Sequence, residues 1–143
     1  MQIDVIEKGT VVDHIKAGKG PRVLRILGVD ENYPEIVALV MNAVSKKSGK
    51  KDIVKIAEKQ VDDKAANTIA LISPGATINI IEGQKVSKKF EVQLPEELNG
   101  VGRCPNPNCM TSVEECMQMF AKEGEDTYRC HYCERLFKAE ELV

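Results

Sequence analysis

Two short cysteine pairs, Cys104-Pro-Asn-Pro-Asn-Cys109 and Cys130-His-Tyr-Cys133, stand 20 residues apart near the end of the chain. Close pairs separated by a foldable loop are typical of a tetrahedral site in which four thiolates bind one metal ion. A site closed by four cysteines leaves the metal no open position for catalysis, so the pattern predicts a structural metal that holds a small domain together. The expected ligands are Cys104, Cys109, Cys130 and Cys133.

The expected ion is zinc, one per chain, because nothing in the sequence indicates an electron-transfer partner for iron. Iron is the alternative, since a small four-cysteine site can also carry redox iron. His131 is a weaker ligand candidate, because it lies between two better-placed thiols. The fifth cysteine, Cys116, lies in the loop between the pairs, and we expect it to be a small buried hydrophobe.

The composition excludes some classes of function. The chain has 143 residues, enough for one ordinary domain or two small ones, with 20 basic and 22 acidic residues. After Asn99 there are 5 basic and 8 acidic residues, and this disfavours the alternative of a zinc ribbon that binds nucleic acid, which needs a basic face. We find no apolar run of membrane-spanning length and no signal peptide, and we expect a soluble, cytoplasmic protein.

Hydrophobic periodicity predicts two helices and several strands before the cysteines. The expected helices cover about 21–28 and 60–73, and Asp62 or Asp63 caps the second. The expected strands cover 1–10, 10–15, 35–44, 51–56, 76–81 and 85–94. This order predicts an α+β protein whose N-terminal part is a ferredoxin-like βαββαβ sandwich, with two helices on one face of a mostly antiparallel sheet.

Composition also predicts the domain boundaries. The Pro and Gly content of residues 95–102 indicates a linker between a domain of residues 1–94 and a second domain of residues 103–143. For the second domain, the four cysteines predict a small zinc-ribbon-like (rubredoxin-like) β fold.

Asp13-His14 and a group of lysines are the candidate binding residues of the first domain. On a strand, Lys51 and Lys55 share a face, and two ammonium groups on one sheet face suit a polyphosphate. A solvated hairpin is the other interpretation, because lysine runs usually face water. The sequence has no P-loop, and a Cys–His pair would have to join the two domains, so we expect a binding protein rather than an enzyme.

Taken together, five segments resemble the regulatory chain of aspartate carbamoyltransferase in order and spacing: residues 9–15, 50–56, 71–79, 104–109 and 130–133. The resemblance covers nearly the whole chain. It implies a non-catalytic subunit in pyrimidine biosynthesis whose N-terminal allosteric domain binds nucleoside triphosphates, with CTP as inhibitor and ATP as activator. It also implies a zinc domain that contacts the catalytic chain, and homodimers of regulatory chains, three of which join two catalytic trimers.

The resemblance assigns roles to particular residues. Asp13 and His14 match positions near the ribose and the phosphates. Lys55 matches a lysine that contacts the ribose and base region, and Lys89 matches a phosphate-binding lysine. Further pocket positions are matched by Ile6, Ile53, Asn79, Ile81 and Val86, with Lys51 as a weaker neighbouring candidate. The four paired cysteines match the zinc ligands. Gln84 stands where the best-known enteric member has a tyrosine, so the sequence leaves open which nucleotide inhibits and which activates.

Overall fold

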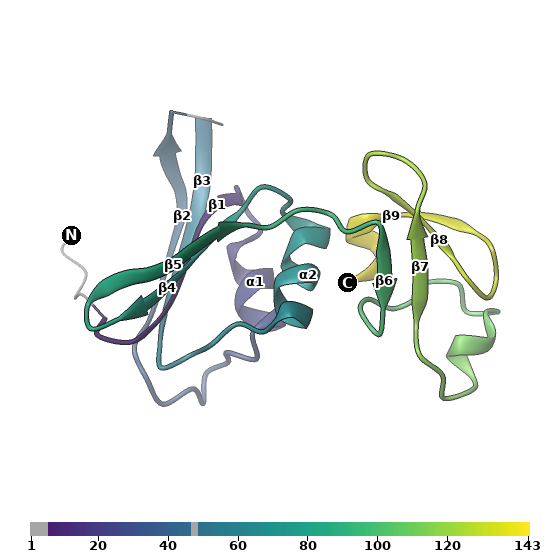
Figure 1. Cartoon of the computed structure of the whole chain (residues 1–143), viewed down its shortest axis with the longest axis horizontal. Helices are drawn as coiled ribbons and strands as arrows, with labels where there is room; N and C mark the ends of the chain where they lie inside the picture. The colour runs from purple at the N-terminus through teal and green to yellow at the C-terminus, as the bar shows by residue number, and fades with distance from the viewer. Residues whose placement is uncertain (1–5, 47–48) are drawn as a thin grey trace. The chain divides into compact units, whose positions relative to one another are not determined.

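The computed structural model describes residues 6–46 and 49–143, and the chain divides into two compact units between Val92 and Gln93 (Figure 1). We call these units the N-terminal and the C-terminal domain. The first contains β1 (Gly9–Lys16), α1 (Gly20–Ile26), β2 (Val37–Ser45), β3 (Gly49–Ala57), α2 (Asp63–Ile72), β4 (Thr77–Glu82) and β5 (Lys85–Glu91). The second contains β6 (Glu97–Asn99), η1 (Met110–Ser112), β7 (Met119–Lys122), β8 (Thr127–Cys130), β9 (Leu136–Lys138) and η2 (Ala139–Leu142). None of the helices among the described residues is long and apolar enough to cross a membrane.

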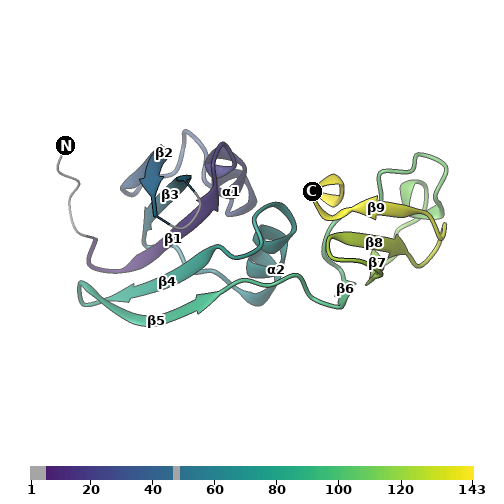
Figure 2. The same cartoon turned by 90° about the horizontal axis from the view of Figure 1, so that it is seen from above.

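The N-terminal domain is one antiparallel sheet with its two helices on the same face (Figure 2). The strand order is β2-β3-β1-β4-β5, and every neighbouring pair is antiparallel. This is the βαββαβ arrangement with β5 added beside β4, so the α+β class predicted from periodicity is confirmed.

The strand expected over residues 1–10 differs from the structure. Residues 6–8 lie outside any strand, Gly9 begins β1, and residues 1–5 lie outside the described part of the chain. Gly9 has a φ of 150°, and a Cβ at this position would lie 2.2 Å from the carbonyl oxygen of Ile56. The glycine is therefore present because β1 and β3 approach closely there.

Apolar side chains of the central strands alternate with polar ones and face the helices. Val12 of β1 and Val54 of β3 are fully buried, and Ile69 of α2 completes this core. The Asp62 carboxylate caps α2 as predicted, because it accepts a hydrogen bond from the Ala65 amide at 2.8 Å. Since successive strand residues point to opposite faces, the intervening side chains lie on the face away from the helices, which we call the open face.

Two bulges interrupt the regular pairing on either side of β3. The register of β1 shifts around His14 and that of β2 shifts around Asn42. Both residues adopt the left-handed backbone region, with φ values of 55° and 60°. A bulge inserts an extra residue and re-aims the side chains near it. We call these features the β1 bulge (Asp13 and His14) and the β2 bulge (Met41 and Asn42).

The C-terminal domain is built on a second antiparallel sheet, with strand order β6-β7-β8-β9. Phe120 and Tyr128 are buried in it, and the Tyr128 hydroxyl donates to the Pro95 carbonyl at 2.6 Å. Strand β6 lies within residues 95–102, which the sequence indicated as a linker. The Pro and Gly content of that range predicted a linker, but its middle residues alternate in burial as a short strand does. Leu98 is fully buried, and its two neighbours are exposed. Residues 97–99 are therefore part of the second sheet.

Candidate functional site

The four predicted cysteines form one cluster in the C-terminal domain. Their sulfur atoms all lie within 4.8 Å of one another. The sulfurs of Cys104 and Cys133 are 3.7 Å apart, and those of Cys109 and Cys130 are 3.8 Å apart. A tetrahedral site with metal–sulfur bonds of about 2.3 Å has sulfur–sulfur edges of roughly 3.8 Å, so the cluster fits one metal ion. Among the described side chains, this group of potential ligands does not include His131.

Backbone amides point at the sulfurs, as expected for tight cysteine knuckles. The Asn106 amide donates to Cys104, and the Arg135 amide donates to Cys133. Burial raises the pKa of Cys104 to about 12. For Cys133, the effect of burial is outweighed by the Arg135 amide and the Asn106 side chain, which lower the pKa to about 7. A divalent cation would displace the thiol protons, and the same amides would then offset the charge of the thiolates.

The fifth cysteine, Cys116, lies apart from the cluster and is exposed, so the expectation that it is buried is wrong. It belongs to the loop between η1 and β7, in which residues 113–117 are all exposed. Its residue type favoured burial, but the loop that carries it packs against no core there.

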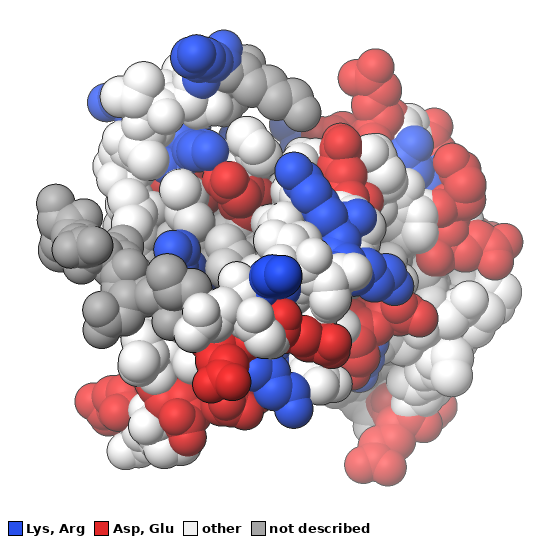
Figure 3. All heavy atoms as spheres, turned by 60° about the vertical axis from the view of Figure 1, so that its left-hand side comes forward, with Lys and Arg blue, Asp and Glu red and all other residues white. Residues whose placement is uncertain are grey.

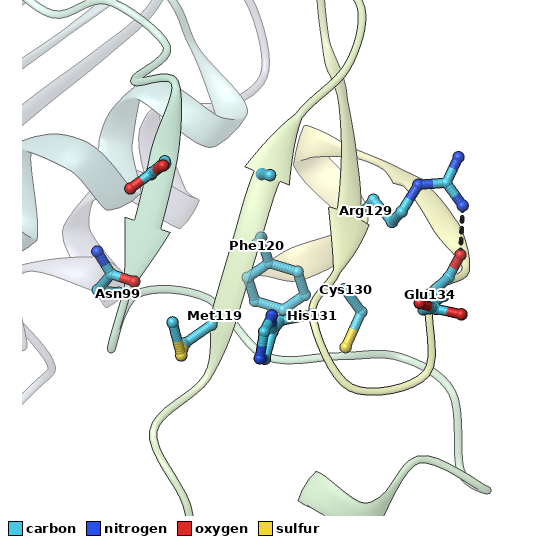
Figure 4. A pocket seen from close by; sticks show the side chains of 9 residues that line it. Asn99, Met119, Phe120, Arg129, Cys130, His131 and Glu134 are labelled. Carbon is cyan, nitrogen blue, oxygen red and sulfur yellow. Dashed lines mark hydrogen bonds between the residues drawn. The ribbon is translucent and has the colours of Figure 1, made fainter.

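A cavity of about 260 Å³ lies on one face of the C-terminal sheet (Figure 4). Asn99 and Met119 line it on one side, and Arg129 lines the other. The Arg129 guanidinium is held by the Glu123 carboxylate at 2.7 and 2.8 Å and by the Glu134 carbonyl oxygen at 2.5 Å. Sequence reasoning missed this hollow because it depends on β6, which was interpreted as linker.

The open face of the N-terminal sheet gathers the residues predicted to bind a nucleotide. Val11 of β1 pairs directly with Lys55 of β3 and with Asn79 of β4, and Asn79 pairs with Lys89 of β5. Residues directly opposite one another in a sheet share a face, so these side chains form one row across four strands. Ile53 lies two residues from Lys55 along β3 and therefore shares the same face.

An apolar cluster adjoins this row. Ile6, Ala57 and Ile81 are buried together, and Val11 packs against them. Val86, directly opposite Ile81 in the sheet, is half exposed. The row and the cluster thus place the partly buried Val11 and the exposed Val86 beside two lysines and an amide. Val11 and Ala57 were not among the predicted binding residues, because small apolar side chains are no signal for a binding site.

Asp13 and His14 of the β1 bulge lie near Lys51. The Lys51 ammonium is 2.9 Å from the Asp13 carboxylate, which also accepts a hydrogen bond from the His14 amide at 2.6 Å. Burial would raise the pKa of Asp13, but the Lys51 ammonium and the His14 amide together hold it below its ordinary value. The His14 Nδ1 atom is buried and has no hydrogen-bond partner among the described residues.

The Asp13–Lys51 ion pair predicts a pH-dependent contribution to stability. A carboxyl whose pKa is lower in the folded state stabilises the fold above its unfolded pKa near 4, and this contribution is lost as the pH falls through the lower folded value. Asp13→Asn should therefore lower the free energy of unfolding at pH 7 by up to about 1 kcal/mol, because the pair is partly exposed. Denaturant titrations without nucleotide should show the difference shrinking below pH 4, and a pH-independent difference would contradict this assignment.

Comparison with known proteins agrees with this arrangement. Residues 1–93 match the allosteric domain of the aspartate carbamoyltransferase regulatory chain, and residues 96–143 match its metal binding domain. The aspartate carbamoyltransferase regulatory chain of Pyrococcus horikoshii is 44% identical over 146 residues, which cover 100% of this chain and 96% of the relative. Those of Thermococcus gammatolerans and Sulfolobus acidocaldarius are 41% and 42% identical over 100% of this chain and over 96% and 89% of the relatives. The chain therefore belongs to the family of aspartate carbamoyltransferase regulatory chains.

Proposed function

We propose that this chain is the subunit through which CTP and ATP tune the activity of an aspartate carbamoyltransferase. A regulatory chain of this family is not itself catalytic, and the reaction of pyrimidine biosynthesis belongs to its partner, the catalytic chain. The proposal rests mainly on the open face of the N-terminal sheet. This face combines an apolar cluster, a cross-strand row that contains Lys55, Asn79 and Lys89, and the ion pair of the β1 bulge.

The parts of a nucleoside triphosphate match the parts of the open face. The apolar cluster suits a flat base, and Lys55 and Asn79 beside it offer donors for the ribose and the base edge. Lys89, at the end of the row, and the partly exposed His14 of the β1 bulge suit the phosphates. On the surface drawn in Figure 3, Lys and Arg side chains are interspersed with Asp and Glu, which supports a compact anionic ligand over an extended nucleic acid.

Calorimetric titration of the full chain with CTP, and separately with ATP, tests this proposal. We expect one nucleotide per chain and competition between the two, because both would occupy the same face. Absence of binding heat at millimolar concentrations, with no rise in Tm, would contradict a nucleotide-binding role.

We also propose that the ion in the four-cysteine cluster is zinc, one per chain, in a cytoplasmic protein whose thiols stay reduced. Metal analysis of the purified chain tests this assignment. A colourless preparation with one zinc per chain is expected, whereas a red protein containing iron would overturn it. The C-terminal domain held by this ion is the part that we expect to contact the catalytic chain, with the exposed Asn108 and Met110 as candidates near the ligands; Asn106 is buried beside the cluster.

The two edges of the N-terminal sheet support a homodimer through β2. Edge strand β5 carries lysines, including Lys85 and Lys88, which discourage strand pairing. Edge strand β2 instead exposes Met41 at 43% and Val44 at 90% of their surfaces. An apolar edge that is not protected by charge is suited to pairing with a second copy, and three such dimers would join two catalytic trimers.

A charge placed on the β2 edge is therefore expected to weaken the dimer. Val44→Lys should shift the monomer–dimer equilibrium toward monomer by about tenfold or more, because it would bury an unpaired ammonium in the contact. Sedimentation of the isolated chain over a range of concentrations measures this shift. Val86→Lys on the opposite edge is the matched control, and an equal effect of both variants would refute a specific role for β2.

A further inference from the structure

Asp52 of β3 is a carboxylate with no exposed surface. One of its oxygens accepts hydrogen bonds from the amides of Gly18 at 3.0 Å and Gly20 at 2.8 Å. The other oxygen accepts from the amide of Asn42 at 3.0 Å. A buried carboxylate is tolerated when several amides satisfy it, so these bonds hold Asp52 in place. None of the donors belongs to β3: two come from the segment that enters α1, and one comes from the β2 bulge.

The neighbours of Asp52 along β3 point to the opposite face of the sheet. Lys51 forms the ion pair with Asp13 of the β1 bulge, and Ile53 lies on the open face. The two bulges flank this same part of β3. In the β1 pairing the register is interrupted opposite residues 52–54, and in the β2 pairing it is interrupted opposite residues 51–53. Residues 51–53 therefore have side chains on both faces of the sheet. Lys51 and Ile53 lie on the open face, and Asp52 lies on the other face, where it binds the β2 bulge.

Packing leaves Asp52 little freedom to move. A Cβ at Gly20 would lie 2.9 Å from the Asp52 carboxylate oxygen and 2.6 Å from Leu39 Cδ1. A close-packed carboxylate held by three hydrogen bonds of 2.8 to 3.0 Å transmits a displacement of its backbone to its partners rather than absorbing it.

We propose that Asp52 is a positioning residue that couples the nucleotide-binding open face to edge strand β2 and to the start of α1. The inference rests on the proposed nucleotide site. A nucleotide that restrains Lys51, Ile53 and Asp13 also restrains the backbone of residues 51–53. Because the Asp52 carboxylate holds the Asn42 amide on the other side of that backbone, the restraint reaches the β2 bulge and the edge proposed for the dimer.

Amide hydrogen exchange of the full chain, followed by NMR with and without CTP, tests this coupling. Suppose that the local opening that exposes an amide to exchange also releases the nucleotide. A CTP concentration about 100 times Kd then slows the exchange of that amide by up to about 100-fold. We expect at least tenfold slowing at Val11 and Asn79 on the open face. We expect comparable slowing at Gly18, Gly20 and Asn42, which lie away from that face.

The variant Asp52→Asn separates coupling from simple stability. Its amide keeps one acceptor oxygen, so it cannot serve the Asn42 amide and the two glycine amides together. We expect the CTP-dependent slowing at Asn42 to disappear while that at Val11 and Asn79 persists. Asp62→Asn makes the same change at the cap of α2, where the amide oxygen can still accept the Ala65 N–H; it is the control and should retain both effects.

Slowing at Val11 and Asn79 of the wild-type chain without slowing at Asn42 would overturn the coupling and leave the nucleotide site standing. Absence of any slowing on the open face would overturn the nucleotide site and, with it, this inference. The wild-type measurement decides the question even if Asp52→Asn does not fold.

Discussion

Removal of the metal is expected to unfold residues 93–143 while residues 6–92 keep their secondary structure. The C-terminal domain has few large buried side chains, among them Leu98, Phe120 and Tyr128, and cannot be held by such a core alone. A structural zinc ion contributes on the order of 10–16 kcal/mol to folding, more than the whole stability of a domain this small. The N-terminal domain has its own helix-covered core and contains none of the cluster cysteines.

Hydrogen exchange measured by mass spectrometry, before and after chelation, follows the two domains separately. Cys130→Ser should reproduce the effect of the chelator, because it removes one of the four ligands. Cys116→Ser is the matched control: this thiol is exposed and lies outside the cluster, so the variant should remain folded in both domains. Loss of N-terminal secondary structure in step with the metal would contradict the independence of the two domains.

Replacement of the lysines in the cross-strand row is expected to have the largest effect on nucleotide binding. A hydrogen bond to a charged group contributes about 1.5–3 kcal/mol. Lys89→Ala and Lys55→Ala should therefore each weaken the affinity for CTP and ATP by about 10- to 100-fold. Both residues lie at strand positions where little else depends on the side chain, so the Tm without nucleotide should change little.

Lys88→Ala provides the comparison for these variants. Lys88 pairs with Ile80 and so points to the other face of β5, where its ammonium lies 5.3 Å from the centre of the Phe90 ring. The Lys88→Ala variant removes the same charge from the same strand as Lys89→Ala, but it leaves the open face unchanged. Calorimetry at fixed ionic strength should show near wild-type affinity for this variant. Equal losses for Lys88→Ala and Lys89→Ala would show that net charge, rather than the row, governs binding.

The sequence predicted those features that depend on local spacing. The cysteine pairs, the Asp62 cap and the shared face of Lys51 and Lys55 each follow from a repeat or an offset within a few residues. The family resemblance supplied the remaining candidates of the open face, whose function the proposed variants test.

Features that depend on contacts between residues far apart in the sequence could not be predicted from local spacing. Asp52 stands in the sequence as one more polar residue of a lysine-rich strand, and its three amide donors come from residues 18, 20 and 42. Strand β6 has only three residues, and its pairing with β7 is what defines it. In both cases long-range contacts, rather than local preference, determine the structure.

The position of Cys116 outside the cluster allows the fraction of chains that carry a metal ion to be measured by thiol labelling. Four of the five thiols belong to the metal cluster, and the fifth lies on an exposed loop. Metal coordination shields a thiolate from alkylating reagents, so a maleimide should modify one cysteine per metal-loaded chain and all five after chelation and unfolding. The mass of the labelled chain thus reports how many molecules in a preparation carry their metal, and a dye attached at Cys116 marks the C-terminal domain without disturbing the cluster.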